Sequence, residues 1–148
     1  MRALLQRVTS AEVRVADRVV GRIGPGWLVL LGVGREDTAA VARALAEKAV
    51  NLRAFADAAG KMNRSALDVG AEVLVVSQFT LYADLRRGRR PFFGAAAPPD
   101  VARGLVEVFS AAVASHGLRV AGGEFGAMMQ VQLVNDGPVT IWLDTDER

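Results

Sequence analysis

A period of two governs residues 3–15, and this alternation constrains the fold more than any other feature of the sequence. Apolar residues share one parity: Ala3, Leu5, Ala11, Val13 and Val15. Polar residues such as Gln6, Glu12 and Arg14 hold the other parity. Successive side chains of a strand point to opposite faces, so this pattern predicts a half-buried β-strand at the start of the chain.

Arg7 interrupts the pattern, because it places a guanidinium at an apolar position. One interpretation is that the strand is frayed or bulged here and that Arg7 reaches solvent. The other is that Arg7 points inward and has a carboxylate or carbonyl partner, since an unpaired buried charge is very costly. The residues of this segment alone do not decide between the two.

The rest of the chain reads as further strands and two helices. After an Ala16-Asp17 turn, strands are expected at 18–23, at 27–33 (covered on both faces) and at 72–79. Two more strands, 128–134 and 139–144, flank a turn at 135–138, and 82–99 is irregular. The strands are mostly hairpin-linked, which predicts an α+β or mixed α/β sheet sandwich, with 1–148 as a single domain.

The two helices are predicted from helical spacing and from their ends. Asp37 is the expected N-cap of the first, with an apolar stripe at Val41, Leu45, Ala49 and Leu52. The second opens at Pro99-Asp100 and ends at His116-Gly117. Its apolar face is expected to hold Val101, Leu105, Val108, Phe109 and Ala112.

Composition removes most familiar catalytic sites. The 148 residues include no Cys and one His, which excludes thiolate nucleophiles and every Cys-based metal site. His116 is expected to cap a helix, so a Ser–His–Asp enzyme is disfavoured. With 51% hydrophobic residues the chain can form a core, and its longest apolar run is too short to cross a membrane. The first residues lack a secretion signal, and a cytoplasmic location without a membrane partner is the expectation.

Two polar segments follow expected strands: Ser77-Gln78-Phe79-Thr80 and 135–140, Asn-Asp-Gly-Pro-Val-Thr. On composition alone, the first is a strand meeting its loop and the second a hairpin turn. Together, however, they resemble the paired signature motifs of the D-aminoacyl-tRNA deacylase family. Residues 1–8 also resemble the first strand of that family, and 125–129 the segment that leads into its second motif.

The resemblance implies a homodimer of three-layer β/β/α sandwich subunits, mostly antiparallel and with two main helices. It implies hydrolysis of the ester that joins a D-amino acid to tRNA, with glycyl-tRNA as a second substrate and with no metal or cofactor. Ser77, Gln78, Phe79 and Thr80 would be the catalytic residues lining the pocket around the ester. A cis Gly137-Pro138 would enter the partner subunit's pocket and reject L-aminoacyl groups, with Met129 nearby and Arg7 bracing the loop.

The inventory of side chains is compatible with this chemistry. An aminoacyl ester is already activated, so positioning and backbone N–H donors can supply a modest rate gain. Thr80 is expected to position or polarise rather than attack, because no base is available to deprotonate it, and the ribose 2′-hydroxyl is a candidate assistant. Four arginines within five positions are candidates for tRNA phosphate contacts, against the alternative of a solvated loop: Arg86, Arg87, Arg89 and Arg90.

Two alternatives stay open at this point. One is a non-catalytic tRNA-binding module that keeps the fold without turnover. The other is a related deacylase that acts on mischarged L-alanyl-tRNA, in which the Gly-Pro bond would be trans.

Overall fold

The computed structural model describes residues 1–147 and contains one main sheet, two long helices and several short elements. In chain order these are β1 Arg2–Val15, β2 Arg18–Ile23, β3 Gly26–Gly32, α1 Ala39–Asn51, β4 Phe55–Ala56, β5 Met62–Arg64, α2 Ala66–Val69, β6 Glu72–Ser77, the 3₁₀ turn η1 Phe79–Tyr82, α3 Pro99–Ser115, β7 Val120–Gly122 and β8 Gln130–Asp144.

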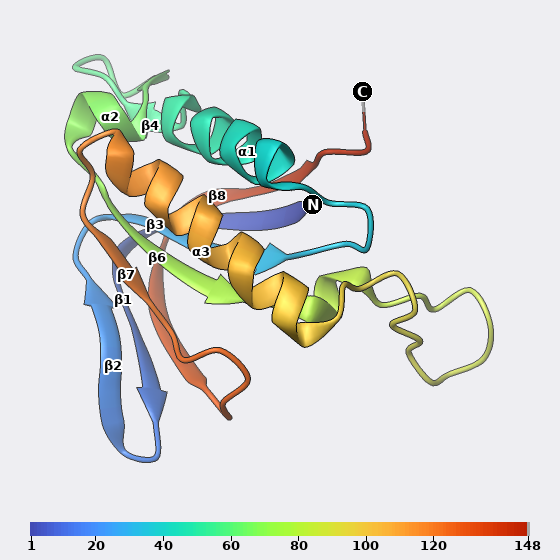
Figure 1. Ribbon diagram of the computed structural model, residues 1–148. Helices are drawn as coiled ribbons and strands as arrows, with labels where there is room; N and C mark the ends of the chain where they lie inside the picture. Colours follow the sequence, from blue (N-terminus) through green and yellow to red (C-terminus); the bar gives the residue numbers. More distant parts are fainter. Residues whose placement is uncertain (148) are drawn as a thin grey trace.

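The main sheet runs β2-β1-β3-β6-β7, and β8 pairs with β1 along its other edge. Pairs of β1 with β2, β3 and β8 are antiparallel, and the pairs of β6 with β3 and with β7 are parallel. Helices α1 and α3 cover one face, while β2 folds away from them on the other (Figure 1). The predicted mixed α/β sandwich with two main helices is therefore confirmed, and the two helices form its third layer.

Two hydrophobic cores separate these layers. The larger lies between the sheet and the helices and contains Trp27, Val29 and Leu31 of β3 with Phe109 of α3. The smaller lies on the opposite face and contains Leu28 of the same strand. Strand β3 is thus buried on both faces, as its unbroken apolar run predicts.

Strand β1 changes core along its length. Ala3 and Leu5 face the helices, whereas Ala11 and Val13, which have the same parity, belong to the smaller core. The exchange occurs where the pairing of β1 with β8 shifts register, between Gln6 and Val8 and again between Val8 and Ser10. An irregularity of this kind bends a strand and re-aims its side chains. The alternation predicts the strand, but not the two cores that it serves.

The prediction of a hairpin at 135–138 is wrong. Both halves of the C-terminal segment belong to one strand, β8, and both pair with β1. Gln6 pairs with Thr140, and Val8 pairs with Asn135. Between these two pairs β1 spans two residue steps, whereas β8 spans five. Residues 136–139 bulge out instead of reversing the chain. A Gly-Pro dipeptide is compatible with a turn and with a wide bulge, because in both its residues lie outside the ladder of hydrogen bonds between strands.

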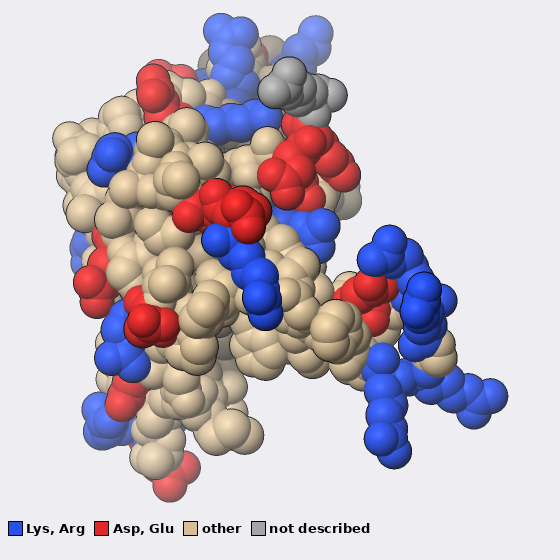
Figure 2. Space-filling view, turned by 45° about the vertical axis from the view of Figure 1, so that its right-hand side comes forward, with Lys and Arg blue, Asp and Glu red and all other residues tan. Residues whose placement is uncertain are grey.

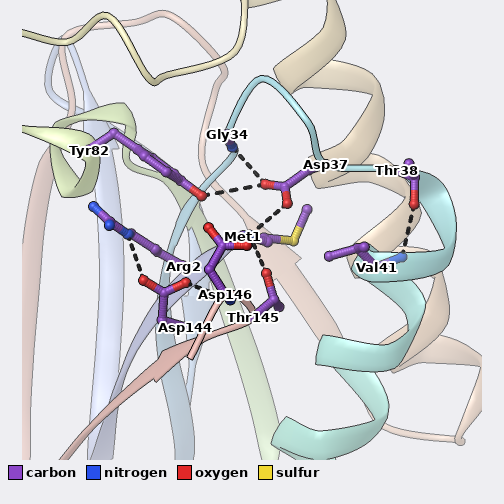
Figure 3. Close-up of polar contacts among 10 residues, drawn as sticks. All are labelled: Met1, Arg2, Gly34, Asp37, Thr38, Val41, Tyr82, Asp144, Thr145 and Asp146. Carbon is purple, nitrogen blue, oxygen red and sulfur yellow. Dashed lines mark hydrogen bonds and ion pairs between the residues drawn. The ribbon is translucent and has the colours of Figure 1, made fainter. Parts of the chain in front are cut away.

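Helix α1 begins one residue later than predicted, because Thr38 rather than Asp37 is its N-cap. The Thr38 hydroxyl accepts a hydrogen bond from the Val41 N–H at 3.3 Å. Asp37 instead binds the α-amino group of Met1 at 2.6 Å and accepts a bond from the Gly34 N–H at 2.6 Å (Figure 3). Met1 is fully buried, and its ammonium group needs this carboxylate partner.

Helix α3 begins at Pro99 and ends at the C-cap His116, and Gly117 adopts a φ of 86°, as its sequence predicts. The predicted apolar face is offset, because Val101 is 42% exposed. The buried residues are Ala102, Phe109 and Val113. Strand β6 also ends earlier than predicted, at Ser77, where the chain enters η1.

Three short elements were not predicted: the β4–β5 pair, helix α2 and strand β7. Ser65 and Asp68 form a capping box around α2, so the Ser-x-x-Asp spacing was a usable signal for that helix. The other two lack periodicity because each strand is only two or three residues long. Among residues 1–147, none of the helices is long and apolar enough to span a membrane.

Glu72 joins β6 to the β2–β3 corner and makes stability depend on pH. The Gly24 N–H donates to its carboxylate at 2.8 Å, and Arg119 pairs with it. Both contacts lower the pKa of Glu72 from its ordinary value of 4.5; the hydrogen bond from Gly24 is the larger cause and the contact with Arg119 the second. A lowered pKa gives stability that is complete above the unfolded value and lost as the pH falls through the folded one.

We therefore predict that Glu72→Gln lowers the free energy of unfolding at pH 7 by about 0.5–1 kcal/mol, because the pair is partly solvated. The variant should also lose less stability than wild type between pH 5 and pH 3. Urea unfolding followed by circular dichroism measures both quantities, with the exposed Glu107→Gln on α3 as control. An equal acid-induced loss in wild type and Glu72→Gln would refute this prediction.

Candidate active site

Strand β6 delivers the first polar segment to the edge of the sheet. Ser77 is its last residue, Gln78 follows, and Phe79 and Thr80 begin η1. The Gln78 N–H donates to the Leu31 carbonyl at 2.8 Å, which extends the β3–β6 pairing by one residue. The Gln78 side-chain amide donates a hydrogen bond to the Thr80 hydroxyl oxygen. The structure thus brings Gln78 and Thr80 together, with Thr80 exposed to solvent.

Arg2 fixes the far end of this turn. Its guanidinium donates to the Leu81 carbonyl at 2.9 Å and pairs with Asp144 at 2.8 Å. The same group lies 4.4 Å from the centre of the Tyr82 ring. The Tyr82 hydroxyl points toward Asp37, and this network ties the turn to both ends of the chain (Figure 3). Sequence reasoning missed Arg2, because it stands at a polar position of the alternation that carries no further signal.

Tyr82 also accounts for Gly34, two residues after the end of β3. A Cβ at Gly34 would lie 2.7 Å from the Tyr82 hydroxyl oxygen, which is closer than real Cβ contacts come. Burial raises the pKa of Tyr82 and keeps the phenol neutral, with the Asp37 charge as the second cause. The ring therefore serves as a packed support for η1.

The second polar segment lies in the bulge of β8. The Gly137-Pro138 bond is cis, as the resemblance implies, and residues 134–138 are all exposed. The Asn135 side-chain amide donates to the carbonyls of Arg7 at 2.9 Å and Val139 at 3.1 Å, which closes the base of the bulge. Gly137 and Pro138 consequently project from the surface on a braced loop.

Arg7 lies inward beneath this loop, so the second interpretation of its position is correct. Its side chain is only 14% exposed and has both expected kinds of partner. One guanidinium nitrogen donates to the Ala54 carbonyl at 2.6 Å, and Nε lies 3.0 Å from an Asp136 carboxylate oxygen. The second contact is an ion pair whose N–H is not aligned for a hydrogen bond. Arg7 therefore connects the loop to the segment that follows α1.

The two motifs do not meet within one chain. Ser77 pairs with Leu31, which pairs with Ala3, whereas the Gly-Pro bulge lies opposite Arg7. Four residues along the strands and three strand spacings separate the two motifs. With about 3.3 Å per residue and about 4.8 Å per strand, the separation is about 20 Å. A single chain therefore presents the turn of the first motif and the projecting loop at separate places.

Met129 lies nearer to the first motif than the strand order suggests. A Cβ at Gly123 would lie 2.6 Å from the Met129 sulfur, so the two residues are in close contact. The Gly123 N–H in turn donates to the Val75 carbonyl at 3.3 Å, two residues before Ser77. Met129 also packs against the smaller core, which contains Val76 of β6, so it lies near the end of that strand. Its neighbour Met128 is 92% exposed and makes no comparable contact with this region.

The arginine cluster lies on a loop that projects beyond η1. We call residues 83–93 the basic arm. Its base is closed by Asp84 and Phe92, whose backbones exchange two hydrogen bonds at 2.7 and 3.0 Å. All four arginines are exposed, and they form the blue cluster at the right of Figure 2. The arm stays next to the first motif because the Phe79 and Phe93 rings pack edge-on, with centroids 5.0 Å apart. Sequence reasoning missed Phe93.

One arginine of the arm is neutralised by a neighbour. Arg86 binds both carboxylate oxygens of Asp84, at 2.9 and 2.6 Å. This bidentate contact is the main cause that lowers the pKa of Asp84 to about 2. The remaining three arginines, Arg87, Arg89 and Arg90, give the arm its positive field.

Within residues 1–147 there is no cluster of three or more His, Cys, Asp or Glu side chains that could hold a metal ion. The hydrogen bond found for the Thr80 hydroxyl comes from the Gln78 side-chain amide. This pair offers a hydrogen-bond donor and an acceptor that can position a polar group.

Comparison with known proteins shows the family of this chain. The model of the family described as D-Tyr-tRNA(Tyr) deacylase matches residues 4–144. The chain belongs to this family. It is 63% identical to the D-aminoacyl-tRNA deacylase of Roseiflexus castenholzii over 98% of this chain and 92% of that one. It is 56% identical to that of Thermosipho africanus over 98% and 97%. Both relatives are named D-aminoacyl-tRNA deacylase.

Solved structures of the deacylase family's fold superpose closely on this chain. A protein titled c-Myc DNA Unwinding Element Binding Protein has a TM-score of 0.91 at 41% identity, covering 98% of this chain and 99% of its own. A probable eukaryotic D-amino acid tRNA deacylase has a TM-score of 0.86 at 19% identity, covering 96% and 97%, and this likeness concerns the fold alone.

The contacts of Arg7 generate a prediction about the loop. Arg7→Met removes the donor to Ala54 and the partner of Asp136, so we expect the free energy of unfolding to fall by about 1–3 kcal/mol. Amide hydrogen exchange at the non-proline residues of 135–139 should accelerate as the bulge loses its support. Arg14→Met, at an arginine of the same strand whose side chain is 42% exposed, is the control and should leave that exchange unchanged. Unaltered exchange at 135–139 in Arg7→Met would contradict the bracing role.

Proposed function

We propose that the protein hydrolyses the ester of D-aminoacyl-tRNA, and of mischarged glycyl-tRNA, in the cytoplasm. The observation that carries the proposal is the pair of exposed motifs in a chain of this family. One is a turn that presents Gln78 and Thr80, and the other is a braced loop that presents Gly137-Pro138. Neither motif needs a metal or a cofactor for the role that we assign to it.

The turn supplies positioning and oxyanion stabilisation. The first backbone N–H groups of a helical turn have no partner within that turn. In η1 these belong to Phe79 and Thr80, because the first backbone bond across the turn is donated by Leu81 to Gln78 at 3.2 Å. Such donors, aimed at the developing negative charge on the ester oxygen, lower the barrier without a charged base. Gln78 orients the Thr80 hydroxyl, which polarises the ester, and the ribose 2′-hydroxyl assists.

Selection requires a second copy of the chain. The two motifs lie about 20 Å apart in one subunit by strand register, and the loop projects outward. A two-fold dimer would place each loop over the partner's turn, because an isologous interface pairs the same two surfaces twice. The pocket of each subunit, with Met129 beside it, is then completed by Gly137-Pro138 of the other.

A backbone wedge explains strict chirality with broad side-chain tolerance. Main-chain carbonyls of the loop would occupy the space that an L side chain needs at the α-carbon, whereas a D side chain or hydrogen points elsewhere. Rejection by a steric clash does not depend on the identity of the side chain. Glycine has no side chain to reject, so glycyl-tRNA passes as a substrate.

The basic arm would hold the tRNA. Arg87, Arg89 and Arg90 are exposed, and the arm starts three residues after Thr80. Contacts from these guanidinium groups to phosphates would add affinity that falls with salt. Because Asp84 stays ionised and paired with Arg86 well below neutral pH, this contribution should be constant between pH 6 and pH 9.

The decisive experiment compares matched D- and L-tyrosyl-tRNA and follows release of the free amino acid. Wild type should release D-tyrosine and spare the L form, whereas Gly137→Val should abolish or relax this discrimination. The substitution is compatible with folding, since a Cβ at Gly137 meets only the Asn135 side chain, at 3.1 Å. Gly104→Val, at an open position of α3, is the control. L-selective release would indicate the L-alanyl-tRNA relative, and no release a binding module; a D-over-L preference unchanged in Gly137→Val would refute the wedge.

The role of Thr80 gives a separate prediction. Thr80→Ala should lower kcat by about 10- to 100-fold without abolishing release, because backbone donors supply the main stabilisation. Thr80→Ser should retain most of the rate. Rapid quenching of wild type with labelled D-tyrosyl-tRNA should trap no covalent acyl-enzyme. Complete loss of activity in Thr80→Ala together with a trapped acyl-enzyme would establish Thr80 as a nucleophile instead.

A further inference from the structure

Phe92 lies exposed in a hollow of the basic arm that no role described above accounts for. The hollow has a volume of about 540 Å³ and is lined by Asp84, Arg86, Arg87 and Phe92. That volume is within the range of small-molecule sites, about 300–1,000 Å³. The Phe92 side chain is 69% exposed, the highest value among the large aromatic residues found exposed. An aromatic ring this open beside guanidinium groups needs an explanation other than core packing.

The hollow has a defined geometry. The paired backbones of Asp84 and Phe92 place these two residues directly opposite each other at the base of the arm. The Asp84 carboxylate then holds the Arg86 guanidinium in a two-point contact on the same side. This arrangement fixes one cation near the ring. Arg87 has no such acidic partner recorded among the ion pairs of the described residues, and it remains available to an anion.

We propose that this hollow is a subsite for an unpaired RNA nucleotide, whose base stacks on Phe92 and whose phosphate contacts Arg87. Unpaired bases of RNA are recognised by stacking on aromatic rings and on arginine planes, next to cations that track the backbone. Both elements are present here in one hollow. The proposal rests on the function proposed above, because it is the tRNA substrate that brings an unpaired end to this place.

The position of the hollow fits the unpaired end that carries the amino acid. Phe92 is adjacent to Phe93, which packs against Phe79 of the first motif with ring centroids 5.0 Å apart. A nucleotide on Phe92 therefore lies a short distance before the terminal nucleotide whose ester would reach Thr80. Phe92 is thus a positioning residue: it directs the end of the chain into the site and takes no part in bond breaking.

The experiment uses uncharged tRNA whose unpaired 3′ end carries the fluorescent base 2-aminopurine. Wild type should quench its fluorescence on binding, and Phe92→Ala should lose the quenching and bind about 5- to 100-fold more weakly, the usual range for one stacked base. Phe92→Trp should restore both. Arg87→Gln should reduce the slope of affinity against salt by about one phosphate contact, whereas Phe92→Ala should leave that slope unchanged.

Leu85→Ala is the matched control, because Leu85 is a 64% exposed apolar residue of the same arm that does not line the hollow. It should bind as wild type does. Equal affinity and quenching in Phe92→Ala and wild type would overturn the proposal. So would a fall in molecular mass of Phe92→Ala in sedimentation, which would make Phe92 an interface residue, or tighter binding of a DNA strand of the same sequence.

The failure of the nucleotide subsite can be distinguished from the failure of the proposed deacylase function. Release of D-tyrosine by wild type, with binding insensitive to Phe92, would refute the subsite and keep the deacylase. Binding that depends on Phe92 without any release would keep the subsite and refute the deacylase. In the successful case, Phe92→Ala should raise KM for D-tyrosyl-tRNA by a similar factor with little change in kcat, as expected for lost uniform binding.

Discussion

The buried guanidinium of Arg7 is the interaction on which the proposed selection depends. A charge that is 14% exposed must be paired, and its partners lie on two sides: the Ala54 carbonyl behind α1 and the Asp136 carboxylate in the bulge of β8. Losing either partner would leave the buried guanidinium of Arg7 less well satisfied. The loop is therefore attached to the helix layer rather than suspended from the strand alone. Rigidity of this kind is what a steric wedge requires, because a flexible loop would move aside for an L side chain.

The sequence was most informative where an apolar stretch lies between clear turn or cap signals. The strand at 18–23, the buried strand β3 and the ends of α3 were all predicted correctly, since each rests on apolar spacing with a Gly or Pro boundary. The single strand β8 was not predicted, because Asn-Asp-Gly-Pro is as compatible with a bulge as with a turn and only pairing with β1 distinguishes them. Asp37 was misassigned for a similar reason. Its preferred partner, the Met1 ammonium, is distant in sequence and close only in the fold.

In the candidate site, too, the residues of a local motif stand out in the sequence, whereas residues that meet only in the fold do not. The residues of the first motif stand together in the sequence, and the Gln78–Thr80 contact follows from their spacing in a tight turn. Their supports were not predictable: Arg2, Tyr82 and Phe93 act across strands and loops, without a local pattern. The charge of the basic arm is visible in the sequence. The sequence does not show that Asp84 neutralises Arg86, or that Asp84 pairs with Phe92 across the arm. Long-range contacts of this type determine how the site is held, whereas the motifs determine what it presents.

The central claim is that each Gly-Pro loop acts on the other subunit, and mixing two variants tests it directly. One variant, Gln78→Ala/Thr80→Ala, has a defective turn and an intact loop; the other, Gly137→Val, has an intact turn and a defective loop. In mixed dimers, one site should have an intact turn and an intact loop, so adding the first variant should suppress release of L-tyrosine from L-tyrosyl-tRNA by the second. A control variant that combines Gln78→Ala, Thr80→Ala and Gly137→Val should have no such effect. If L-tyrosine release by Gly137→Val stays the same in dimers verified as mixed, the loop acts within its own chain, which contradicts action on the other subunit.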